Sequence, residues 1–188
     1  MTDYIRGKGG RFAGSIGTGK HAIPTASHVS ALCGSSGTPS PGYDYATMHA
    51  VSLKSATVHV ATEATAAELH DQWRASRQLP DGTYEPRWKD DGQGGQVDIA
   101  NTPYAELPPV WQAENKSAAE SAICAILKNP DATVESLAAT VHEDWLDRNG
   151  DWAPPEQKLP YAELTEEEKE KDRVVVRAAL ASLSSSAR

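Results

Sequence analysis

One pentapeptide, Pro-Tyr-Ala-Glu-Leu, occurs twice in this chain, at residues 103–107 and 160–164. A His-x-x-Trp pair precedes each copy, at residues 70–73 and 142–145. Both pairs lie in stretches where apolar residues recur at helical spacing, and both pentapeptides directly precede another such stretch. This repeated order predicts two related units of two helices each. Two helices are too few to bury both apolar faces alone, so the units are expected to share one core.

The two units differ in the loop between the His-x-x-Trp pair and the pentapeptide. His70 and Tyr104 are 34 residues apart, whereas His142 and Tyr161 are 19 residues apart. The 15 additional residues predict an insertion in the first unit around residues 88–102, which are rich in Gly and Asp. Surface loops tolerate such insertions at a small cost in free energy.

The periodicity of the chain predicts a mainly α fold with a few short strands and a flexible N-terminal arm. Helices are expected at about residues 66–77, 110–128, 134–149 and 166–183. The chain is thereby divided into a Gly/Ser/Pro-rich arm, a first unit and a second unit, at residues 1–45, 46–130 and 131–188.

Local signals refine this outline. Capping-box spacing, in Thr65 with Glu68 and in Thr165 with Glu168, predicts the starts of the first and last helices. Partial alternation of apolar and polar residues predicts short strands within residues 51–60. The segment that follows the first helix, from residue 80 to residue 102, is expected to be a long loop with a short strand at residues 83–84.

Charge is unevenly distributed along the chain. The whole chain has a net charge of −8, yet residues 1–30 carry four basic side chains and one acidic one. An acidic body disfavours a nucleic-acid surface, because phosphate contacts need clustered Lys and Arg. No apolar stretch approaches the length of about 20 residues that spans a bilayer, and residues 1–10 lack the apolar segment of a secretory signal. The sequence therefore favours a cytoplasmic protein that binds neither nucleic acid nor a membrane.

Motifs for catalysis or metal binding are weak. Residues 14–20 match a phosphate-binding loop, but His21 replaces the Ser or Thr that would bind magnesium, and no buried strand precedes them. Cys33 and Cys124 form no zinc motif. We expect Cys124 to be buried, and a disulfide between the two is disfavoured inside a cell. No nucleophile and base are suitably arranged, so the chain is predicted to be non-enzymatic, without metal or cofactor.

Several positions of the second unit follow one another in a recognisable order: Ala138, His142, Glu143, Trp145, Gly150, Trp152, the pentapeptide and the segment TEEEKEKDR at residues 165–173. In this order the unit resembles the RyR domain, the repeat named after ryanodine receptors and also found in small bacterial and phage proteins. The first unit keeps fewer of these features: His70, Trp73, Gly82, Tyr84 and the pentapeptide. Aligning the pentapeptides sets Asn115-Lys116 opposite Asp172-Arg173. The resemblance implies a non-enzymatic module that binds a nucleotide-derived ligand or mediates protein contacts.

Six residues are the candidates for ligand contacts: Trp152, Arg173, Tyr161, Tyr84, Tyr104 and His142. Trp152 and Tyr84 are predicted to lie in loops, and loops on a rigid scaffold commonly carry binding groups. Arg173 could bind a phosphate bidentately, with an intramolecular bridge between the units as the competing interpretation. The two pentapeptide tyrosines and His142 could equally be core residues, the more frequent role for a His on an apolar helix face.

The sequence thus predicts a small-ligand-binding module, with a nucleotide-derived ligand in the groove between the units. The alternative is a structural or protein-interaction component of a phage or mobile element, in which the basic arm docks on a protein partner. The sequence is compatible with a homo-oligomer.

Overall fold

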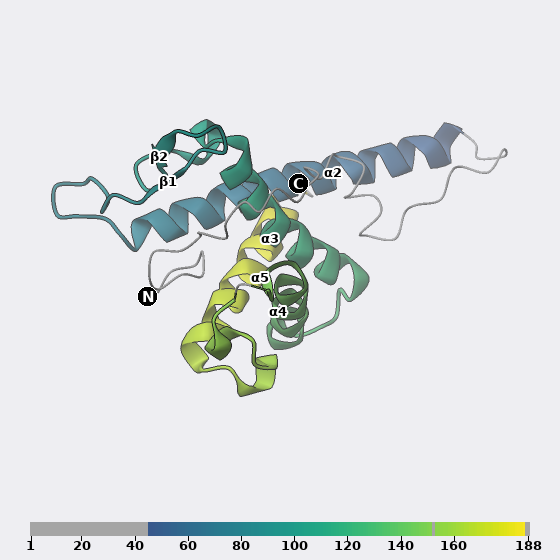
Figure 1. Ribbon diagram of the computed structural model, residues 1–188. Helices are drawn as coiled ribbons and strands as arrows, with labels where there is room; N and C mark the ends of the chain where they lie inside the picture. Colours follow the sequence, from purple (N-terminus) through teal and green to yellow (C-terminus); the bar gives the residue numbers. More distant parts are fainter. Residues whose placement is uncertain (1–44, 152, 187–188) are drawn as a thin grey trace.

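Four α-helices form most of the part of the chain that the structure describes (Figure 1). This computed structural model describes residues 45–151 and 153–186, with side chains from Ser55 onward. The helices are α2 (Tyr45–Ala75), α3 (Pro109–Lys128), α4 (Val134–Asn149) and α5 (Glu166–Ser186). The predicted mainly α class is confirmed. The predicted arm, with its phosphate-loop-like segment and Cys33, lies outside the described residues except for Tyr45, and so does Trp152.

Helix α2 begins earlier than predicted and includes residues 51–60, so the prediction of short strands there was wrong. Buried positions recur every four residues along it, at Ala61, Thr65, Leu69 and Trp73, and form one face against the core. Burial of this face outweighs the weak local alternation, because tertiary packing supplies most of a helix's stability. Thr65 does not cap the helix. Its hydroxyl donates to the carbonyl oxygen of Ala61, one turn earlier, at 2.7 Å.

The other helix boundaries agree closely with the prediction. Pro108 occupies the N-cap of α3 and Pro109 its first position, where no amide proton is needed. Thr133 caps α4, since its hydroxyl accepts from the amide of Ser136 at 3.2 Å. The hydroxyl of Thr165 accepts from the amide of Glu168 at 3.3 Å, which is one half of the predicted capping box.

The predicted insertion in the first unit forms a β-hairpin. Strand β1 (Trp88–Asp90) pairs antiparallel with β2 (Gln96–Asp98). In the connecting turn, Gly92 and Gly94 have φ of 81° and 86°, values that favour glycine. Before the hairpin, the predicted strand at residues 83–84 is present only as one antiparallel bridge, between Gln78 and Tyr84.

All four helices contribute to one core, as the repeat predicted. Its buried side chains include Leu69 from α2, Ile123 from α3, Val141 from α4 and Val176 from α5. Helix α4 packs on α3 and α5, and α2 packs on α3 and α5. In Figure 1, α2 lies across the upper part of the view, with α4 and α5 below it and the hairpin above.

A second, smaller cluster of buried residues belongs to the first unit alone: Trp73, Ile99, Ala100, Leu107 and Trp111. Ile99 and Ala100 come from the insertion, which is therefore packed into the fold. Cys124 is buried, as predicted. It is also disulfide-bonded, contrary to the expectation that a disulfide is disfavoured.

Candidate functional site

Each unit holds its histidine in the same way. His70 Nε2 lies 2.9 Å from the carbonyl oxygen of Thr102, and His142 Nε2 lies 2.9 Å from that of Leu159. Thr102 and Leu159 each directly precede the pentapeptide proline. A carbonyl oxygen only accepts hydrogen bonds, so Nε2 carries the proton in both units. Both histidines are fully buried and fix the pentapeptide to the preceding helix.

The aromatic neighbours of the two histidines also correspond. His70 stacks on Trp73 with ring centroids 5.7 Å apart, and His142 stacks on Trp145 at 6.4 Å. The pentapeptide tyrosines lie 6.4 and 6.1 Å from the same two imidazoles. Both pentapeptides form a single 3-10 turn, η1 (Tyr104–Glu106) and η3 (Tyr161–Glu163). Matching contacts of this kind support the predicted equivalence of the two units.

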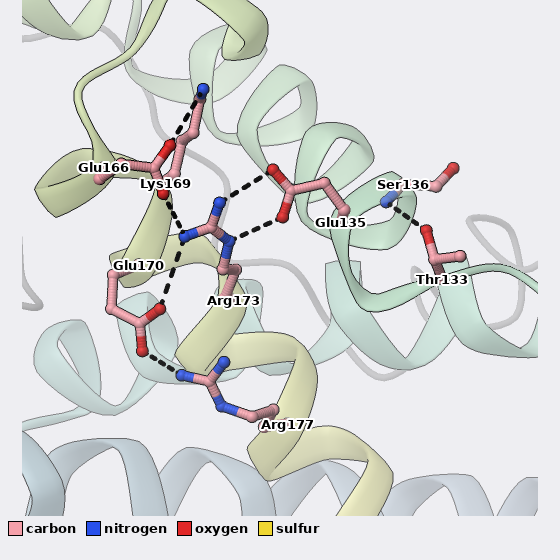
Figure 2. Close-up of polar contacts among 8 residues, drawn as sticks. All are labelled: Thr133, Glu135, Ser136, Glu166, Lys169, Glu170, Arg173 and Arg177. Atoms are coloured by element: carbon pink, nitrogen blue, oxygen red, sulfur yellow. Dashed lines mark hydrogen bonds and ion pairs between the residues drawn. The ribbon is translucent and has the colours of Figure 1, made fainter.

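An ion pair joins the two helices of each unit at equivalent positions. Glu63, seven residues before His70, lies 2.7 Å from Lys116. Glu135, seven residues before His142, accepts two hydrogen bonds from Arg173, at 2.7 and 2.9 Å (Figure 2). The predicted bridge at Arg173 is therefore present, but it joins α4 and α5 within the second unit instead of joining the two units.

The guanidinium of Arg173 is surrounded by carboxylates of its own unit. Its Nη1 also donates to Glu166 at 2.9 Å and lies 3.7 Å from Glu170 (Figure 2). Hydrogen bonds from Arg173 lower the pKa values of Glu135 and Glu166, and the same contacts raise the pKa of Arg173. A ligand anion at Arg173 would have to displace these carboxylates.

The pentapeptide tyrosines differ in their hydroxyl contacts. Tyr104 donates to Glu63 at 3.1 Å, and its burial together with the Glu63 charge raises its pKa. Burial, opposed by Arg173 and reinforced by Glu135, raises the pKa of Tyr161 to about 12. Glu135 is near the Tyr161 hydroxyl, but no hydrogen bond of normal geometry reaches that buried oxygen. Both rings are packing residues beside the histidines.

The units differ most clearly at the second ring nitrogen of the histidine. His142 Nδ1 lies 3.3 Å from the buried carboxylate of Asp172. The equivalent residue of the first unit is Asn115, whose amide donates to the carbonyl oxygen of Trp111 at 2.9 Å. His70 Nδ1 is buried without a hydrogen-bond partner. Burial lowers the pKa of His70, so its imidazole is neutral at pH 7.

Basic and aromatic side chains gather beside the hairpin in the first unit, where the sequence interpretation had placed only Tyr84. We call these residues the basic–aromatic cluster: Arg74, Arg77, Arg87, Lys89, Trp73, Tyr84 and Trp111. Three cations lie over aromatic rings: Arg74 4.4 Å from the centre of Tyr84, Arg77 5.0 Å from Trp73 and Lys89 5.9 Å from Trp111. Such contacts attract cations to the negative faces of the rings.

Like charges in this cluster lie close enough to affect one another. Burial, followed by the charges of Arg87 and Arg77, lowers the pKa of Lys89. Burial and then Arg87 lower the pKa of Arg77, against an opposing effect of Glu85. A lowered pKa means that the surroundings disfavour the charged form of the side chain. A nearby anion would favour that charged form.

The sequence interpretation missed the four cations because it averaged charge over long segments. Their signal was present as two pairs of basic residues: Arg74 in the last turn of α2 with Arg77 two residues beyond its end, and Arg87 directly before β1 with Lys89 within it. The insertion brings the second pair against the first. An average over residues 31–188 is acidic and hides this local excess of positive charge.

The six sequence-predicted residues do not come together at one groove between the units. Tyr84 belongs to the basic–aromatic cluster, and Tyr104 packs against the apolar cluster beside it. Tyr161, His142 and Arg173 lie together in the second unit, and Trp152 lies outside the described residues.

Two further properties bear on the kind of site. Among the described residues, no three His, Cys, Asp or Glu side chains are grouped as metal ligands. No helix in that part of the chain has both the length and the apolar character needed to cross a membrane. In comparisons with known proteins, no family model, curated protein or solved structure matches the chain.

Proposed function

We propose that the protein is a non-enzymatic module that binds a small anionic ligand, with the basic–aromatic cluster of the first unit as its site. The observation that carries this proposal is the proximity of Arg77, Arg87 and Lys89 in a chain of net charge −8. Burial and neighbouring positive charges lower the pKa values of Arg77 and Lys89. A bound anion would oppose the effect of the neighbouring charges.

The chemistry of the cluster suits a phosphate group. Arg presents a planar fork of donors that matches phosphate oxygens, and Lys adds a mobile point charge. Partial burial strengthens each contact, because the effective dielectric constant is lower than in water. The predicted nucleotide-derived ligand would satisfy this requirement through its phosphate, and the resemblance to RyR domains makes nucleotides the first compounds to test.

The second unit supports the proposal indirectly. Its candidate cation, Arg173, already has a bidentate carboxylate and two more carboxylates nearby. The second unit therefore offers its strongest anion-binding group only at the cost of a well-made internal ion pair. We accordingly place the ligand in the first unit, away from the groove that the sequence interpretation favoured.

A titration with defined ligands tests the proposal. Adenosine and guanosine monophosphates, cyclic adenosine monophosphate and pyrophosphate should raise the melting temperature in proportion to the logarithm of their concentration, because they bind only the folded state. Isothermal calorimetry at low ionic strength then gives the dissociation constant for each ligand that stabilises the protein.

Charge-neutralising variants locate the site. We expect Lys89→Gln and Arg87→Gln each to weaken binding about tenfold, the effect of losing one charge-assisted hydrogen bond. Lys158→Gln removes the same charge from an exposed loop of the second unit and should bind like the wild type. If all three variants bind alike, or if no ligand stabilises the wild type, the proposed function is wrong.

A further inference from the structure

Glu85 supplies a carboxylate to the basic–aromatic cluster from within the chain. Its Oε2 lies 3.5 Å from Nη1 of Arg77, while the Glu85 side chain is 67% exposed and that of Arg77 only 12%. The carboxylate thus approaches the cluster from the solvent side.

The backbone fixes this position. Residues 83–85 return antiparallel to residues 77–79, and the Glu85 amide donates to the Arg77 carbonyl oxygen at 2.9 Å. The turn between them is closed by Asp81, whose carboxylate accepts from both the amide and the hydroxyl of Thr83, at 3.0 and 2.6 Å. Gly82 has a φ of 86°, which this turn requires. The turn therefore holds the backbone of Glu85 opposite Arg77, whether or not the two side chains are in contact.

We propose that Glu85 is an internal competitor for the anion site, which occupies Arg77 in the free protein and is displaced when an external anion binds. This inference rests on the proposed function, since it assigns a regulation to the same site. Because the Glu85 carboxylate is largely exposed and lies 3.5 Å from Nη1 of Arg77, water can replace this contact at little cost, so the carboxylate can leave Arg77 readily. Its main effect is to raise the ligand concentration needed for binding.

The test compares pyrophosphate binding by the wild type and by Glu85→Gln, measured by isothermal calorimetry at low ionic strength. Removing the competitor should tighten binding about two- to fivefold, the range expected for a weak ion pair whose carboxylate is exposed. Glu85→Asp retains the charge and should not tighten binding. Asp131→Asn removes one negative charge from an exposed position in the second unit and should bind like the wild type. Circular dichroism and melting establish that each variant folds.

The outcomes separate this inference from the function on which it rests. Tighter binding by Glu85→Gln alone supports the inference. Unchanged or weaker binding by Glu85→Gln overturns it, while wild-type binding that depends on Arg87 and Lys89 leaves the proposed function standing. Equal tightening by Asp131→Asn also overturns it, because the effect would then come from overall charge. If neither the wild type nor Glu85→Gln binds pyrophosphate or a nucleotide, both proposals are wrong.

Discussion

His70 and His142 share one hydrogen bond and differ in the other. Both donate from Nε2 to a backbone carbonyl oxygen, and only His142 has a carboxylate at Nδ1. A hydrogen bond between Nδ1 and Asp172 needs one proton, held by either partner. Both ring nitrogens of His142 therefore have a partner in the second unit, whereas the Nδ1 of His70 is buried without a hydrogen-bond partner in the first.

This contrast predicts the effect of exchanging one residue type. Asp172→Asn copies the first unit's Asn115 into the second unit, and should lower the free energy of unfolding by about 1–3 kcal/mol, the cost of leaving a buried polar group poorly paired. Urea unfolding measures the change. Asp131→Asn, with the same change in charge at an exposed position, should have a much smaller effect. Equal losses in the two variants would show that the buried pair contributes nothing specific.

At the scale of elements, an ion pair ties the two helices of each unit together. Glu63 and Lys116 join α2 to α3, and Glu135 and Arg173 join α4 to α5. Hydrogen bonds from Arg173 lower the pKa of Glu135 below its usual value of 4.5. The pair therefore stabilises the fold above about pH 4.5, and this contribution is lost as the pH falls through the lowered pKa.

Glu135→Gln tests that pH dependence. The wild type should be more stable than the variant near neutral pH, and the two stabilities should converge as the pH falls below 4.5. Urea unfolding at a series of pH values gives the difference. Glu143→Gln, an exposed change on the same helix, provides the reference. A difference between wild type and Glu135→Gln that does not change with pH would contradict the assignment to Glu135.

Sequence reasoning found the elements that depend on local signals and missed those that depend on distant contacts. Helical periodicity located α3, α4 and α5, a capping box marked the start of α5, and the repeat placed the insertion and aligned Lys116 with Arg173. Residues 51–60 were misassigned because the apolar face of α2 is defined only by the helices packed on it. The basic–aromatic cluster was missed because it joins the end of α2 to a hairpin that the sequence showed only as a loop.

At the scale of the whole molecule, the two units share the main hydrophobic core. Leu69 of the first unit packs in one core with Val141 and Val176 of the second. A domain with a single core usually unfolds in one cooperative step. A substitution that loosens the packing of one unit should therefore destabilise the whole described part of the chain.

Leu69→Ala measures that coupling. Removing this fully buried side chain should cost about 2–5 kcal/mol, and amide exchange should accelerate in α5 as well as in α2. Hydrogen exchange read by mass spectrometry on peptides from both helices gives the result. Val60→Ala, at a side chain 56% exposed, is the matched control. Exchange that accelerates in α2 and is unchanged in α5 would mean that the units open separately.

The matched histidines give the molecule an internal standard. Both imidazoles donate to a carbonyl oxygen at the same distance, and both stack on a tryptophan one turn along the helix. Nuclear magnetic resonance of one sample therefore records a test signal and its reference under identical temperature, salt and concentration. Differences between the two signals then isolate what a carboxylate does to an otherwise equivalent ring.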